Sequence, residues 1–148
     1  AASGVNGMVG GQFLDLRDHA SKSPEALRQV HLLKTGRLIA AAVRCSLLYA
    51  RPEPDVDAAL RAFAHELGLL FQIVDDILDV AGDEDSLGKS VGADERRGKV
   101  TYASYYGLDR ARELAAESHE RASRLLSAVP GSTGDLAELT ELVFARQS

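Results

Sequence analysis

Between Asp55 and Ala81, apolar residues recur every three or four positions. They are Val56, Leu60, Phe63, Leu67, Leu70, Val74 and Ile77. This spacing places them on one face of an α-helix. Asp55 is a favourable N-terminal cap for such a helix. We therefore predict an amphipathic helix over residues 55–81, the clearest periodic pattern in the chain.

The remaining sequence is also helical in character, and no segment has a convincing strand pattern. The predicted helices cover residues 5–19, 23–49, 109–128 and 135–146, with a further helical stretch beginning near residue 101. Residues 82–100, rich in glycine and charge, are predicted to form a loop. The Gly10-Gly11 pair costs the first helix about 1 kcal/mol per glycine, which indicates close packing or a nearby ligand. A length of 148 residues suits one all-α domain.

Composition narrows the possible functions. The formal net charge is −5, which makes general nucleic-acid binding a poor interpretation. Cys45 is the single cysteine, so an internal disulfide is excluded, and we expect this residue to be a small buried hydrophobe. No apolar run has the length of a membrane span, and no signal peptide is visible. We therefore expect a cytoplasmic protein.

Three aspartates cluster near the end of the predicted long helix, in the segment FQIVDDILD. Asp75, Asp76 and Asp79 are three or four residues apart, so they share a helix face, and Gln72 extends it by one turn. Mutual repulsion and the negative end of the helix dipole both call for a nearby cation. Oxygen ligands suit Mg²⁺ or Ca²⁺, and Mg²⁺ commonly completes its shell with phosphate. The alternative interpretation is a solvated acidic surface at a helix end.

Lysines next to glycines form a second chemical signal. Lys34 lies in the sequence Lys-Thr-Gly at residues 34–36, Lys89 follows Gly88, and Lys99 follows Gly98. A glycine lets the backbone approach an anion that the neighbouring ammonium group can bind. Each lysine alone is most simply a solvated surface charge. Together with the aspartates, they become candidate diphosphate ligands.

A calcium-binding loop is a competing interpretation of the glycine-rich segment. Asp83, Asp85 and Asp94 occupy the first, third and twelfth positions of such a loop. Leu87, however, stands where an oxygen ligand is required. This mismatch makes the calcium loop the weaker alternative.

The segments GMVGGQFLDL, KTG, FQIVDDILD, LGKSVGAD and GKVTY, in that order, resemble the trans-polyprenyl diphosphate synthases. That family includes farnesyl and geranylgeranyl diphosphate synthases, and the resemblance runs to about Tyr106. It implies an all-α fold of the isoprenoid synthase type, with helices around a central cavity. It also implies a magnesium-dependent reaction, in which an allylic diphosphate ionises, isopentenyl diphosphate attacks the cation and a proton is lost.

Carried over by position, the resemblance implies roles for individual residues. Asp75 and Asp79 would bind the Mg²⁺ that bridges the allylic diphosphate, with Asp76 beside them. The side chains expected around the substrate diphosphate are Lys34, Lys89, Lys99, Gln12 and Asp15. The expected catalytic residues are Lys34, which neutralises the departing diphosphate, and Thr35 and Gln72, which point oxygens at the developing cation.

Members of this family are about twice as long as this chain and are usually homodimers. Residues 1–148 thus resemble the C-terminal portion of a single prenyltransferase domain, and we expect them to be inactive without the N-terminal half. A class I terpene cyclase is one alternative, because it shares the fold and an aspartate motif. The other is a non-catalytic helical subunit of a split or heteromeric synthase.

Overall fold

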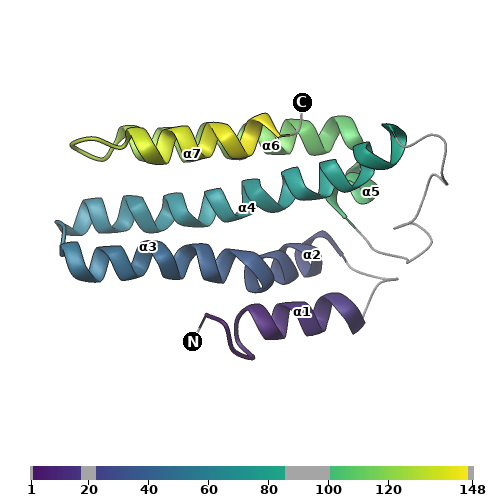
Figure 1. Ribbon diagram of the computed structural model, residues 1–148, viewed down its shortest axis with the longest axis horizontal. Helices are drawn as coiled ribbons and strands as arrows, with labels where there is room; N and C mark the ends of the chain where they lie inside the picture. Colours follow the sequence, from purple (N-terminus) through teal and green to yellow (C-terminus); the bar gives the residue numbers. More distant parts are fainter. Residues whose placement is uncertain (1, 18–22, 86–100, 147–148) are drawn as a thin grey trace.

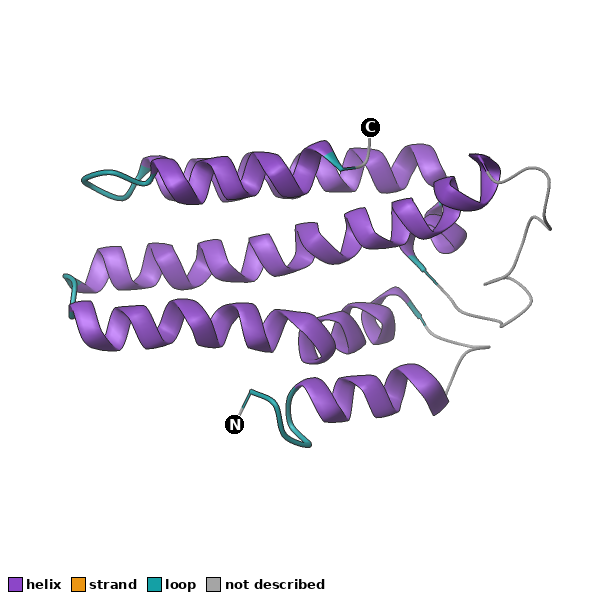
Figure 2. Ribbon diagram, viewed as in Figure 1, coloured by secondary structure: helices purple, strands orange, loops and turns teal. Residues whose placement is uncertain are grey.

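The computed structural model describes residues 2–17, 23–85 and 101–146, and these ranges are helical almost throughout. The elements are α1 (Met8–Arg17), α2 (Pro24–His31), the π-helical turn η1 (Leu32–Gly36), α3 (Arg37–Ala50), α4 (Pro54–Asp85), α5 (Tyr102–Tyr106), α6 (Leu108–Ser127) and α7 (Gly134–Ala145). Within these ranges no residue forms a strand, as Figure 2 shows by colour. The all-α prediction is confirmed.

The long helices lie side by side as layers around α4 (Figure 1). Helix α4 packs against α6 and α7 on one side and against η1 and α3 on the other. Helix α1 lies at the outer edge, where it contacts η1 and α2. The central position of α4 places its aspartates among elements from several parts of the chain.

The apolar face of α4 supplies more of the buried core than any other described helix, as its periodicity predicts. Phe63, Leu70, Val74 and Ile77 are fully buried, and Leu67 is 6% exposed. Helix α6 meets this surface with small side chains, which let the two helices approach closely. Its fully buried residues are Ala111, Ala115, Ser118 and Ala122.

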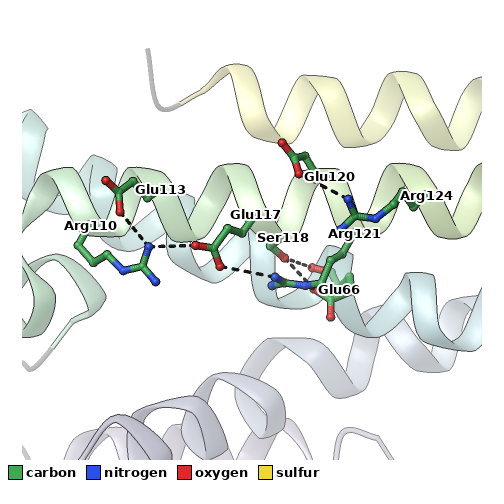
Figure 3. Close-up of polar contacts among 8 residues, drawn as sticks. All are labelled: Glu66, Arg110, Glu113, Glu117, Ser118, Glu120, Arg121 and Arg124. Atoms are coloured by element: carbon green, nitrogen blue, oxygen red, sulfur yellow. Dashed lines mark hydrogen bonds and ion pairs between the residues drawn. The ribbon is translucent and has the colours of Figure 1, made fainter.

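A polar network fixes α6 to α4 within this contact (Figure 3). Ser118 Oγ lies 3.0 Å from Glu66 Oε2 and 3.1 Å from the Glu66 carbonyl oxygen. Arg121 Nε donates to the same carboxylate at 3.0 Å. The glutamate is thereby paired and hydrogen-bonded at the edge of the core, as a partly buried charge requires.

The predicted helix 23–49 is interrupted by a π-helical turn. It begins as expected, because the Ser23 hydroxyl accepts from the Ala26 N–H at 3.3 Å and Pro24 occupies the first turn. At Leu32 the α-helix widens into η1, and α3 follows from Arg37. Arg51 ends α3 in the left-handed conformation, with φ 48° and ψ 56°.

Three sequence expectations need correction here. Asp55 is not the N-terminal cap of α4, because the helix begins one residue earlier, at Pro54. Helix α4 runs to Asp85, four residues beyond Ala81, because a single glycine such as Gly82 weakens a helix without ending it. Cys45 is exposed rather than buried. It is two residues from Leu47, the buried residue of α3, and two residues are about 200° apart around a helix.

Candidate functional site

Four polar side chains of α4 lie within a narrow arc of the helix. At about 100° per residue, Asp75, Asp79, Gln72 and Asp76 follow one another over about 100° of the circumference. Asp75 and Asp79 are half-buried. Gln72 and Asp76 are buried, at 5% and 3% exposure. The predicted polar face exists, but two of its side chains, Asp75 and Asp79, are half-buried, whereas the other two, Gln72 and Asp76, are buried.

Asp76 is bound into the protein interior. Its Oδ2 accepts the backbone N–H of Tyr102 at 2.8 Å and lies 3.8 Å from His31 Nε2. The carboxylate therefore joins α4 to the start of α5 and to the end of α2. Sequence reasoning assigned no role to His31 or Tyr102. The available signals were the position of His31 three residues before Lys34 and the capping residue Thr101 before Tyr102.

The expected influence of the helix dipole on the aspartates is not supported. Asp79 lies six residues before the end of α4 at Asp85. The dipole acts mainly within the last turn of a helix. Of the two reasons given for a nearby cation, only the mutual repulsion of the closely spaced carboxylates remains.

Lys34 lies in η1 and is held by α1. Its Nζ donates to Asp15 Oδ2 at 2.8 Å, and 32% of the lysine side chain remains exposed. Asp15 is buried, with its carboxylate toward the lysine. Two of the five residues that the sequence predicts around the diphosphate, Lys34 and Asp15, are thus brought together. Gln12 is exposed, one turn earlier on α1, and Thr35 is half-buried next to Lys34.

Glycines allow η1 to lie directly between α1 and α4. A Cβ added at Gly11 would lie 2.3 Å from the Lys34 backbone nitrogen, far inside van der Waals contact. A Cβ added at Gly68 would lie 3.1 Å from the Cα atom of Gly36. Close packing of the α1 backbone against η1 therefore explains why the helix carries the destabilising Gly11; close packing and a nearby ligand were the two possible reasons expected from the sequence.

Tyr102 packs beside His31 and the buried Asp76. Its ring lies 5.4 Å from that of His31 and stacks on Tyr106 at 6.2 Å. Burial raises the pKa of the Tyr102 phenol to about 12, partly opposed by the positive charge of Arg28. The phenol is therefore a neutral hydroxyl under ordinary conditions.

Some predicted ligands cannot be placed. Lys89 and Lys99 lie outside the described residues, as does Asp94 of the calcium-loop alternative. Asp83 and Asp85 belong to the last turn of α4. Among the described residues, no group of three or more His, Cys, Asp or Glu side chains is arranged to hold a metal ion. No helix in these ranges has the length and apolarity to cross a membrane.

Solved structures share this arrangement of helices. The geranyltransferase of Legionella pneumophila matches with a TM-score of 0.79 and 33% identity, covering 99% of this chain and 46% of its own. That of Helicobacter pylori, solved with magnesium and isoprenyl diphosphate, matches with a TM-score of 0.76 and 29% identity, over 98% and 48% of the two chains. The fold and these matches together define an all-helical protein of the isoprenoid synthase type.

Sequence comparison identifies the family. The profile described as polyprenyl synthetase matches residues 2–143, so the chain belongs to the polyprenyl synthetase family. The farnesyl diphosphate synthase of Escherichia coli K12 is 42% identical over 148 residues, which cover 96% of this chain and 48% of that protein. The chain spans about half the length of the curated relatives it matches.

Proposed function

We propose that the complete protein containing this chain is a prenyltransferase, which condenses isopentenyl diphosphate with an allylic diphosphate into a longer linear isoprenoid diphosphate. Family membership and the 42% identity to a farnesyl diphosphate synthase support this assignment. The half-length match supports a C-terminal portion of one prenyltransferase domain, with the N-terminal half supplied in the same or a separate polypeptide. On this proposal, residues 1–148 alone are inactive.

The observation that carries the proposal is the packing of the lysine-bearing turn η1 between α1 and the aspartate-bearing helix α4. Lys34 is fixed by Asp15 at 2.8 Å while part of its side chain stays exposed. A lysine held in this way can neutralise a departing diphosphate without first being ordered.

Asp75 and Asp79 are suited to hold Mg²⁺. Both are half-buried, one turn apart on α4, and they offer only oxygen ligands. Two carboxylates suffice for an ion that takes its remaining ligands from water and substrate phosphate. When bound, Mg²⁺ would spread the negative charge of the leaving diphosphate.

The remaining site residues would stabilise the cation and the substrate. Thr35 and Gln72 would direct oxygens toward the developing carbocation, and the burial of Gln72 would fix its orientation. Gln12 would contribute to diphosphate binding from α1. Lys89 and Lys99 would add further positive charge. We also propose that the complete protein is a cytoplasmic homodimer, in keeping with the family.

The test is to incubate the full-length gene product with isopentenyl diphosphate, an allylic diphosphate and Mg²⁺. A longer linear diphosphate is the expected product. Released hydrocarbon would instead identify a terpene cyclase. If neither product forms, the chain belongs to a non-catalytic subunit and the proposal is wrong.

The role of Asp75 has its own prediction. Asp75→Ala in the full-length protein should lower turnover by at least about a hundredfold, because a metal ligand is lost. The circular dichroism spectrum should not change, since the side chain is half-exposed. Glu138→Ala, which removes an exposed carboxylate from α7, is the control and should be silent. Near-normal turnover of Asp75→Ala would exclude the metal role.

A further inference from the structure

Asp76 differs from its two neighbours in the aspartate segment. Its side chain is 4% exposed, and its Oδ2 accepts the Tyr102 N–H at 2.8 Å. Asp75 and Asp79 are half-buried instead. One of three adjacent carboxylates is therefore directed at the backbone of another helix.

The hydrogen bond from Tyr102 adds a third contact to the N-terminal cap of α5. The first backbone N–H groups of a helix have no partner within that helix. In α5, Thr101 Oγ1 accepts the Ser104 N–H at 3.0 Å, and Ser104 Oγ accepts the Thr101 N–H at 2.8 Å. The Tyr102 N–H donates instead to the carboxylate of Asp76, which is 26 positions earlier in the chain. A carboxylate is a strong acceptor for such a group.

The same carboxylate also faces the end of α2. His31 Nε2 lies 3.8 Å from Asp76 Oδ2, and the His31 ring lies 5.4 Å from that of Tyr102. His31 directly precedes η1, the turn that carries Lys34. Asp76 therefore lies where α4, α5 and the beginning of η1 meet.

We propose that Asp76 is a positioning residue, whose hydrogen bond to the Tyr102 backbone sets the rotation of α4 so that Asp75 and Asp79 face the candidate site. The buried apolar face of α4 fixes its general orientation, and the hydrogen bond from Tyr102 to Asp76 further opposes rotation of this part of the helix about its axis. Asp76 lies about 100° from Asp75 around α4, so fixing one carboxylate directs the other. The kinetic part of this inference rests on the proposed prenyl transfer, whereas the structural part does not.

The test compares Asp76→Asn, Asp76→Ala and Asp75→Asn in the full-length protein. Asparagine keeps a carbonyl acceptor for the Tyr102 N–H but loses the negative charge that strengthens binding of Mg²⁺. Three quantities are measured: the hydrogen-exchange rate of the peptide containing Tyr102, the Mg²⁺ concentration at half-maximal turnover, and turnover itself.

Asp76→Asn should keep exchange protection at Tyr102 and should shift the Mg²⁺ midpoint by less than about twofold. Asp76→Ala should lose protection by about tenfold, because the cap is removed. Asp75→Asn should raise the Mg²⁺ midpoint by about tenfold or more while Tyr102 stays protected.

Two results would overturn the inference. One is an Asp76→Asn protein whose Mg²⁺ midpoint rises as far as that of Asp75→Asn, which would make Asp76 a metal ligand. The other is unchanged Tyr102 exchange in Asp76→Ala. A wild-type protein without prenyl transfer would refute the proposed function only, since the exchange measurement needs no turnover and still decides the structural part.

Discussion

The phenol of Tyr102 illustrates how the fold alters a single ionisable group. Burial raises its pKa from 10.0 to about 12. The folded state thus favours the protonated phenol, and this contribution to stability is fully present below pH 10. It is lost as the pH rises from 10 through about 12.

The free energy of unfolding should therefore fall across this alkaline range partly through Tyr102. Tyr102→Phe should reduce the slope of stability against pH between 10 and about 12. Denaturant titrations at several pH values would measure it. Tyr49→Phe is the matched control, because Tyr49 is 94% exposed. Equal slopes for Tyr102→Phe and the wild type would contradict the prediction.

Cys45 shows what residue-level pattern reasoning leaves open. Its neighbours in sequence are apolar, which suggested burial, yet only part of α3 faces the interior. Leu47 is the buried residue of that helix, and Leu48 and Tyr49 are exposed. An apolar helix without strong periodicity does not reveal which side meets its partner, so single positions on it cannot be assigned from sequence.

Among the elements, the turn η1 is the one that the sequence did not predict. The stripe from Leu27 to Leu47 is compatible with a continuous α-helix, and π-helical turns are rare, so the spacing gave no reason to expect one here. The structural cause is tertiary, because Gly11 and Gly68 bring two other helices against this turn. Contacts between distant parts of the chain are not encoded in local spacing.

The contact between α1 and η1 should tolerate no side chain at residue 11. In Gly11→Ala, the new Cβ would meet the backbone nitrogen of Lys34 at 2.3 Å, so one of the two elements must move. We expect a loss of about 1–3 kcal/mol in the free energy of unfolding. Gly134→Ala, where the nearest atom is 3.9 Å away, should not destabilise the protein. Denaturant unfolding of both variants measures the difference, and equal stabilities would disprove the close contact.

The interface between α4 and α6 depends on small side chains. Ala115 is fully buried on α6, so Ala115→Leu should overpack the core and lower the free energy of unfolding by about 1–3 kcal/mol. Ala137→Leu places the same side chain at an exposed position of α7 and serves as the control. Thermal unfolding compares them. A stable Ala115→Leu protein would mean that the two helices are less closely packed than described.

At the scale of the whole molecule, α1 presents an apolar surface. Val9, Phe13 and Leu16 are 52%, 55% and 65% exposed, at spacings that place them on one side of the helix. A groove of about 450 Å³ lies beside them, lined by residues that include Val5 and Leu14. Large exposed apolar patches are uncommon on isolated soluble proteins.

The 148-residue chain, expressed alone, should therefore self-associate and bind an apolar dye. Gel filtration and dye fluorescence provide the measurement. Phe13→Ser should reduce both effects, because it removes apolar surface at the centre of the patch. Tyr49→Ser, at an exposed residue of α3, is the comparison. If the chain is monomeric and does not bind the dye, the prediction that the apolar surface of α1 promotes association is wrong.

The all-α fold and the family could be predicted from the sequence, whereas the contacts of individual site residues could not. Helical periodicity in α4 identified the core, and the order of motifs indicated the family. The division of the aspartates between Asp76 and its neighbours was not predictable, because it depends on Tyr102, which is 26 residues away in sequence. The metal and diphosphate roles of the site residues remain proposals.

Because α4 is a single long helix, a small change of angle at its first residues would move its far end by a large distance. It begins at Pro54, directly after the turn that Arg51 opens, and Asp75 lies about 30 Å along it. A tilt of about 5° at that turn would displace Asp75 by about 3 Å, more than a whole Mg²⁺–oxygen bond length. Substitutions in a turn far from the aspartates would therefore move Asp75, unless the helices packed on either side of α4 hold it in place.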